Sequence, residues 1–185
     1  MSKLAEIVME NVGKSSFDMR CFFQGMVDKG ELEAYLVRIN EEIVKKDDKK
    51  ERIVIIKKGA TLVPTKEIQE NRNIFVKDSK TGIFYNLNIG SQGGAFYDDG
   101  DSQTIYHNCI LEKLTKSFDR KNIDFNSYAG LVIPEEIIEA RLRVNHSDDW
   151  NSSGETDYIG VSHGNFTIEG EKDSLFEKVY EFVRK

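Results

Sequence analysis

Residues 83–89 alternate between two kinds of side chain, and this pattern narrows the choice of fold more than any other feature of the chain. The odd positions, which would face a core, are Ile83, Tyr85, Leu87 and Ile89. The even positions are Phe84, Asn86 and Asn88. Because successive side chains of a strand point to opposite faces, the pattern predicts a half-buried strand with a polar outer face. One buried and one polar face is typical of an antiparallel sheet.

Shorter runs of β-branched and aromatic residues predict further strands. These runs are residues 53–56, 74–76 and 104–106. A hairpin is expected near the C-terminal end, where residues 158–161 and 166–168 flank the turn-like sequence Ser-His-Gly-Asn at 162–165. These segments and residues 83–89 together predict a mostly antiparallel sheet.

Apolar residues recur at helical spacing in the remaining segments. The predicted helices cover residues 4–12, 18–27 (with Asp18 as cap), 32–44, 108–118 (with Asn108 as cap), a segment that begins at Pro134, and 175–183. Helices at both ends around an antiparallel sheet make an α+β fold. Since no repeat or linker interrupts the chain, we expect a single α+β domain that spans residues 1–185.

Composition limits the class of protein. Of the 185 residues, 39% are hydrophobic and only two are proline, so the chain can form a core and is not a disordered segment. The 26 basic residues face 32 acidic ones, a net charge of -6, which argues against general nucleic-acid binding. The lack of a long apolar window or a signal peptide predicts no membrane association. The only two cysteines, Cys21 and Cys109, form no disulfide framework, so a cytoplasmic location is expected.

A glycine-rich stretch near the middle of the chain carries the best candidate site. Its aromatic and acidic residues are Phe96, Tyr97, Asp98, Asp99 and Asp101. Glycine leaves such a loop conformationally permissive, and loops with exposed aromatics commonly carry function. We therefore predict that these five residues form part of a partner-binding surface. The same three aspartates offer oxygen ligands of the kind that Mg²⁺ takes, which leaves phosphoryl chemistry open as an alternative.

Other patterns are weaker candidates. The loop from Asp149 to Asp157 places oxygen donors at the spacing of a calcium loop, but Gly160 stands where a bidentate glutamate should close the site, so no tight calcium site is expected. The sequence Gly-Lys-Ser-Ser at 13–16 lacks the earlier glycine of a phosphate-binding loop, because Val8 stands there. The three histidines, His107, His146 and His163, have no sequence context that pairs them with each other or with a cysteine.

Two functions remain open after this reading. The first is a small acidic interaction protein, of inhibitor or immunity type, that binds a basic protein surface and needs no cofactor. The second is a metal-dependent hydrolase or phosphoryl-transfer enzyme that uses Asp98, Asp99 and Asp101, with His107 nearby in the sequence. The absence of a specific catalytic motif favours the first function, and the sequence leaves the oligomeric state open.

Overall fold

The computed structural model describes residues 5–10, 12–46, 54–96, 102–118, 125–126, 130–131, 133–151 and 159–185. Within these residues the chain forms an antiparallel sheet of eight strands, a small two-stranded sheet and two α-helices. The strand order of the large sheet is β1-β10-β9-β6-β5-β4-β2-β3. The predicted antiparallel sheet with helices is confirmed, and the sheet is the larger part of the fold.

The elements have the following bounds. The large sheet consists of β1 (Ala5–Glu10), β2 (Leu32–Lys46), β3 (Val54–Thr65), β4 (Asn73–Asp78), β5 (Phe84–Phe96), β6 (Ser102–Leu114), β9 (Ile138–Asn151) and β10 (Ile159–Glu169). The small sheet pairs β7 (Phe125–Asn126) with β8 (Gly130–Leu131). The α-helices are α1 (Ser16–Asp28) and α2 (Ser174–Val183), and a 3₁₀ turn, η1 (Glu135–Ile137), precedes β9.

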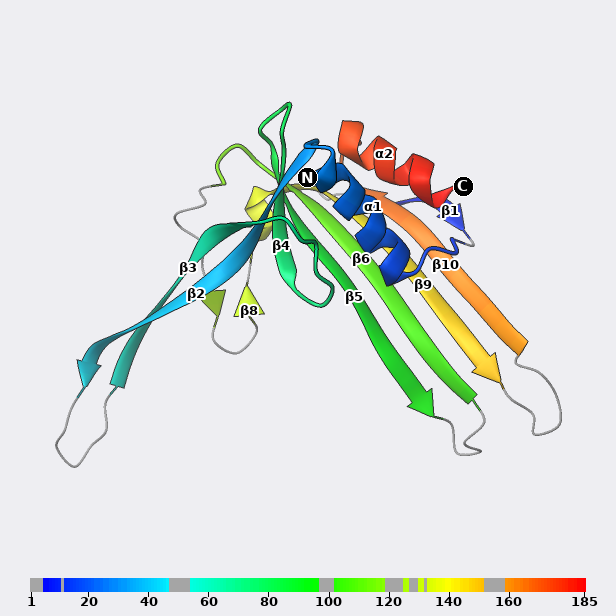
Figure 1. The fold of residues 1–185 in the computed structure, drawn as a ribbon, viewed down its shortest axis with the longest axis horizontal. Coiled ribbons are helices and arrows are strands. Elements are labelled where there is room, and N and C mark those ends of the chain that lie inside the picture. Colours follow the sequence, from blue (N-terminus) through cyan, green and yellow to red (C-terminus); the bar gives the residue numbers. More distant parts are fainter. Residues whose placement is uncertain are drawn as a thin grey trace.

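Both α-helices lie on the same face of the sheet, across β5, β6, β9 and β10 (Figure 1). The main core lies between the two helices and the sheet. Its largest fully buried side chains include Phe23, Phe166, Phe176, Leu111 and Leu142. We call the opposite face of these strands the open face. The β2–β3 ribbon diverges from the other strands toward the far end of the molecule (Figure 1).

A second apolar cluster contains Phe75, Leu114 and Ile138 as its buried members. Tyr35 and Val37 of β2 pack against it, whereas their neighbours Leu32 and Ala34 belong to the main core. Both faces of the β2–β4 part of the sheet are therefore covered by apolar side chains. Apolar residues on two faces of one strand obscure its period of two in the sequence.

Each helix begins at a side-chain cap. Ser15 caps α1 by accepting a hydrogen bond from the backbone N–H of Asp18, whose carboxylate accepts one from the backbone N–H of Ser15. Asp18 is thus the third helical residue of a capping box and not the cap that we predicted. Asp173 caps α2, and the hydroxyl of Tyr85 donates a hydrogen bond to the same carboxylate. The predicted C-terminal helix is confirmed.

Three predicted helices are wrong, because residues 4–12, 32–44 and 108–118 lie mainly in strands β1, β2 and β6. In β6, Cys109 and Leu111 face the main core, whereas Leu114 belongs to the second cluster. A register shift between Lys113 and Leu114 accompanies this change. The helical spacing of these residues therefore arises from two cores on opposite faces of the strand, which no local pattern reveals.

The prediction of a helix from Pro134 is also wrong, because only the short η1 turn forms there before β9 starts. In β9, Ala140, Leu142 and Val144 are buried and alternate with Arg141 and Arg143. The alternation of buried and polar side chains along residues 140–144 therefore favours a strand, despite the Pro-Glu-Glu sequence that favours a helix start. In the part of the chain that the structure describes, no helix is long and apolar enough to cross a membrane.

The predicted hairpin at 158–168 is wrong, because residues 159–169 form the single strand β10. Gly164 lies within this strand, and a Cβ atom built on it would overlap the carbonyl oxygen of Val12. The glycine thus permits a close approach of the chain between β1 and α1, and it does not serve a turn. The other strand predictions are confirmed, since β3, β4, β5 and β6 contain most of residues 53–56, 74–76, 83–89 and 104–106.

Candidate functional site

The predicted partner-binding residues lie at the connection between β5 and β6. Phe96 is the last residue of β5. Tyr97, Asp98, Asp99 and Asp101 lie outside the described residues. The calcium-loop residues divide in the same way, because Asp149 belongs to β9 and most of the remaining loop, to Asp157, is outside the described part. Both predictions therefore stay untested.

The sheet register brings these two connections to the same end of the molecule. Ser102, the first residue of β6, pairs with Asn151, the last residue of β9. Asn151 also pairs with Ile159, the first residue of β10. The ends of β5, β6, β9 and β10 point away from the helices at the same side of Figure 1. We call this end of the sheet, where residues 97–101 and 152–158 connect the strands, the distal end.

The parts of these four strands that lead to the distal end contain acidic residues but no lysine or arginine. Residues 81–112, which include all of β5 and most of β6, contain no lysine or arginine. Neither do residues 144–171, which include half of β9 and all of β10. The acidic residues of the two segments are Asp98, Asp99, Asp101, Glu112, Asp148, Asp149, Glu155, Asp157, Glu169 and Glu171. All the lysines and arginines of the chain belong to other segments, which include Lys113 near the end of β6 and Arg141 and Arg143 in the first half of β9.

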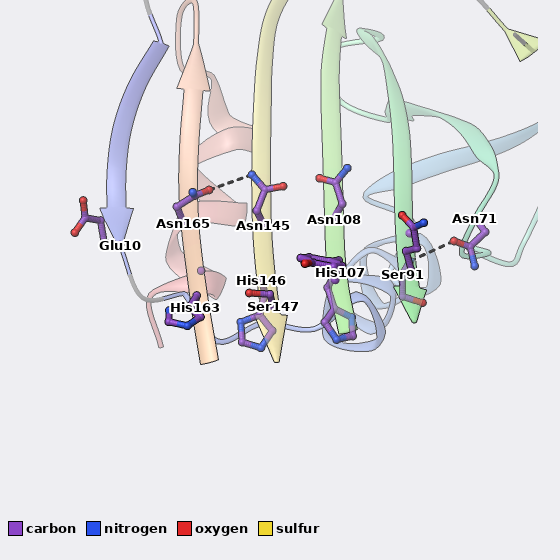
Figure 2. Close-up of a pocket in the computed structure, with 14 residues that line it drawn as sticks. Glu10, Asn71, Ser91, His107, Asn108, Asn145, His146, Ser147, His163 and Asn165 are labelled. Atoms are coloured by element: carbon purple, nitrogen blue, oxygen red, sulfur yellow. Dashed lines mark hydrogen bonds between the residues drawn. The ribbon is translucent and has the colours of Figure 1, made fainter. Parts of the chain in front are cut away.

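A hollow of about 960 Å³ lies across five strands on the open face. Two rows of polar residues run across its strands. The first row pairs Glu10 with Asn165, Asn165 with Asn145, Asn145 with Asn108, and Asn108 with Gly90. We call its three asparagines the asparagine row, and Figure 2 shows them side by side on β10, β9 and β6. The second row pairs His163, Ser147, Tyr106 and Gln92 in the same order of strands.

Asn71 closes the hollow on its β5 side. Its backbone N–H donates a hydrogen bond to the carbonyl oxygen of Ile89 at 2.6 Å, and its side-chain oxygen accepts one from the backbone N–H of Ser91 at 3.2 Å. Asn71 precedes β4, and it takes the place of a neighbouring strand beside β5 where β4 does not extend. It has a left-handed φ of 61°, which asparagine tolerates. Any Cβ atom at Gly90 would come within 3.2 Å of the Asn71 side-chain oxygen. Glycine at this position therefore keeps the edge of the hollow compact.

A histidine cluster, consisting of Ser16, His107, His146 and Asp148, lies on the other face of the same strands. His146 Nδ1 is 2.8 Å from the carbonyl oxygen of Val12, and its Nε2 is 2.8 Å from Asp148 Oδ1. These two contacts hold the His146 ring at both of its nitrogens and fix its orientation. The rings of His107 and His146 stack with their centroids 5.6 Å apart.

The order Ser16, His107, Asp148 suggests a nucleophile, a base and an acid, but the geometry serves a different role. The backbone N–H of Ser16 donates to His107 Nδ1 at 3.1 Å, and the Ser16 hydroxyl is 3.0 Å from the same nitrogen. Ser16 is only 4% exposed, and His107 Nε2 is 3.5 Å from Asp148 Oδ2. A base whose lone pair already binds a backbone N–H cannot take a proton from the hydroxyl without breaking that bond. The cluster instead anchors the start of α1 to the sheet.

The two cysteines lie in different environments. Cys109 is buried in the main core, and this burial raises the pKa of its thiol to about 12. Cys21 is exposed on α1. A thiol with so high a pKa carries almost no thiolate near neutral pH, so Cys109 is a small buried core residue and not a nucleophile.

Metal-binding side chains do not gather in the described part of the chain, where no three of His, Cys, Asp and Glu are placed to hold one ion. Asp98, Asp99 and Asp101, which carried the metal hypothesis, lie outside that part. His107, the histidine that follows them in the sequence, is held by Ser16 and Asp148 on the helix-covered face.

Sequence reasoning missed both the asparagine row and the histidine cluster, because each depends on the register of β6, β9 and β10. Asn108 and Asn145 carry no motif and become neighbours only through the β6–β9 pairing. In a strand over residues 104–114, Tyr106 and Asn108 share one face and Cys109 and Leu111 the other. This alternation is the one local signal of the polar face.

Comparisons of the chain with protein-family models, with curated proteins and with solved structures found no match.

Proposed function

We propose that this chain is a small acidic interaction protein of the cytoplasm, of inhibitor or immunity type, that binds a basic protein surface with the distal end of its sheet. The observation that carries this proposal is the absence of lysine and arginine from residues 81–112 and 144–171, together with the seven acidic residues that fall within 98–101 and 148–157. Since β6 pairs with β9, the strands that these two connections follow or precede are neighbours in the sheet.

An acidic region without interspersed cations attracts a basic partner over a long range. Its carboxylates raise the rate of association, and this effect weakens as salt screens the charges. The aromatic residues of the same connection, Phe96 and Tyr97, are the expected anchors, because buried aromatic side chains supply much of the binding energy of an interface. Asp98, Asp99 and Asp101 then act mainly on association and the aromatics mainly on dissociation.

The test compares two charge variants that differ only in location. The first variant changes Asp98, Asp99 and Asp101 to asparagine. The matched control changes Glu31, Glu33 and Glu67 to glutamine; these residues are exposed and lie outside residues 81–112 and 144–171. Both variants remove three negative charges from the full-length protein, so an effect of net charge alone would appear in both.

Affinity capture with the full-length protein, followed by mass spectrometry, identifies candidate partners. Surface plasmon resonance then measures the association and dissociation rates at several salt concentrations. We expect a basic partner whose association slows, and depends less on salt, only in the aspartate variant. Tyr97→Ala should accelerate dissociation, with a cost of about 2 kcal/mol in binding free energy.

Several results would contradict the proposal. One is a partner that is not basic, and another is equal binding by the parent and both charge variants when circular dichroism shows that all three fold. Metal-dependent hydrolysis of a phosphate ester that disappears in the aspartate variant would instead favour the alternative, a phosphoryl-transfer or hydrolytic enzyme.

A further inference from the structure

The hollow on the open face is lined mostly by uncharged hydrogen-bonding residues, with Glu10 as its one carboxylate. It is separate from the charged distal end on which the proposed function rests. We propose that this hollow binds a neutral polyhydroxylated ligand, an oligosaccharide laid across the strands. The inference rests on the hydrogen-bonding groups of the hollow, on its exposed aromatic ring, on its charge and on its length.

The side chains of the hollow offer paired donors and acceptors. Asn145 donates a hydrogen bond through Nδ2 to the side-chain oxygen of Asn165 at 3.0 Å, which orients both amides on the open face (Figure 2). This bond leaves the oxygen of Asn145 and the NH₂ of Asn165 available. The side chains of Asn108, Gln92 and Ser147 belong to the same lining. Each amide supplies a donor and an acceptor side by side, the arrangement that neighbouring sugar hydroxyls require.

Tyr106 supplies the apolar part of the site. It is 52% exposed and lies next to Asn108 on the same face of β6, in the row between Ser147 and Gln92. An exposed tyrosine ring presents a flat apolar surface with a polar hydroxyl at its edge. The ring can therefore pack against the C–H groups of a sugar ring while the amides bind its hydroxyls. Most binding sites for small ligands combine an apolar surface with a few convergent polar groups in this way.

The charge of the hollow disfavours anionic ligands. The described residues that line it include no lysine or arginine, and Glu10 at one end of the asparagine row is its one carboxylate. Arg143 belongs to the next row of the open face and does not line the hollow. A nucleic acid or a phosphorylated ligand needs cations to neutralise its phosphates, and the lining of the hollow includes no lysine or arginine to supply them. A neutral ligand avoids this repulsion.

The length of the hollow favours a chain of sugars over a single sugar. The first row spans five strands, from Glu10 on β1 to Gly90 on β5. Neighbouring strands are about 4.8 Å apart, so the row extends for about 19 Å. Polar groups repeat along this line at each of the middle strands. A linear oligosaccharide repeats its hydroxyl groups along its length and can contact several of them at once.

The experiment measures binding of neutral tetrasaccharides to the full-length protein. The probes are cellotetraose, maltotetraose, mannotetraose, xylotetraose and chitotetraose, and a neutral Gly-Ser-Asn repeat peptide serves as the competing class. Isothermal titration gives the affinity. Nuclear magnetic resonance follows the side-chain NH₂ signals of Asn108, Asn145 and Asn165, which report directly on the hollow. We expect at least one tetrasaccharide to bind and to shift these signals, and the peptide to leave them unchanged.

Three variants locate the binding. Tyr106→Ala should abolish it, whereas Tyr106→Phe, which keeps the ring, should retain it. Asn108→Ala removes an amide that no described side chain needs and should weaken binding by about tenfold. Gln69→Ala, a polar truncation outside the hollow, is the control and should bind like the parent. Circular dichroism checks that each variant folds.

Binding of none of the tetrasaccharides at millimolar concentration would overturn the inference. So would binding of the peptide at the asparagine row, or saccharide binding that survives Tyr106→Ala. None of these results depends on a protein partner, so the inference and the proposed function can fail independently.

Discussion

The crossing of Val12 over Gly164 leads to our most specific prediction about stability. A Cβ atom at position 164 would overlap the carbonyl oxygen of Val12, and it would lie 2.8 Å from the carbonyl carbon and 3.0 Å from the carbonyl oxygen of Asn145. All three atoms belong to the backbone, so no side chain can turn away to make room. Gly164→Ala should therefore displace the segment that connects β1 to α1.

The size of the effect follows from the contacts that this displacement breaks. Carbon atoms pack comfortably at about 3.5–4.0 Å, so the Val12 carbonyl must withdraw by about 0.7 Å or more from its present 2.8 Å. The hydrogen bond from His146 Nδ1 to that carbonyl, now 2.8 Å, would then exceed the usual limit. Overpacking costs about 1–3 kcal/mol, and an unsatisfied buried donor costs about 1–3 kcal/mol. We expect Gly164→Ala to lower the free energy of unfolding by about 2–6 kcal/mol.

Gly25→Ala is the matched control. Gly25 lies in the interior of α1, and a Cβ atom there would meet no heavy atom within 4 Å. The same chemical change should stabilise the protein by about 0.5–1 kcal/mol, because alanine favours the helix. Urea unfolding followed by far-ultraviolet circular dichroism measures both changes. The reasoning is refuted if Gly164→Ala unfolds within about 0.5 kcal/mol of the parent while Gly25→Ala behaves as expected.

Three further predictions concern buried polar and titratable groups. In the native protein a thiol reagent at pH 8 should modify Cys21 and leave Cys109 unmodified, because burial raises the pKa of Cys109 to about 12. Unfolding in urea should make both thiols reactive. Rapid labelling of two thiols in the native state would contradict this prediction. Burial and the hydrogen bond to the carboxylate that caps α2 raise the pKa of Tyr85 above its ordinary value of 10.0. The folded state therefore keeps a proton that the unfolded state loses, so this group costs stability as the pH rises above about 10, and the stability difference between the parent and Tyr85→Phe should narrow there in alkaline urea titrations. The Arg141 guanidinium donates hydrogen bonds of 2.9 and 2.7 Å to the Glu112 carboxylate. Arg141→Met leaves this carboxylate without its cation and should lower the free energy of unfolding by about 2–3 kcal/mol. Combining Arg141→Met with Glu112→Gln should recover part of the loss if the ion pair is its cause.

Local patterns determined several elements of this protein correctly. The alternation of residues 83–89 predicted β5, where Tyr85, Leu87 and Ile89 are buried in the main core. The apolar stripe near the C-terminal end predicted α2, whose Phe176 and Val179 lie in the same core. In both segments one face meets a core and the other meets solvent or polar groups. A single buried face imposes its own period on the sequence, and the sequence can then be read without knowing the partner.

The helices predicted over β2 and β6 show where local patterns fail. In β2, Leu32 and Ala34 face the main core while Tyr35 and Val37 face the second cluster. In β6, Cys109 and Leu111 face the main core while Leu114 belongs to the second cluster. Apolar residues on both faces of a strand produce spacings of three and four that resemble those of a helix. The long-range pairing of the strands decided the outcome.

The same distinction holds for the candidate sites. The acidic and aromatic residues Phe96 to Asp101 stand together in the sequence, so the sequence alone could propose them as a binding surface. The asparagine row could not be proposed in this way, because Asn108 and Asn145 are 37 positions apart by residue number and meet only through the β6–β9 register. A site made of consecutive residues can be recognised in the sequence. A surface that crosses several strands forms only after backbone hydrogen bonds have aligned those strands. The register, set by burial of the main core, is therefore what the tertiary structure alone decided.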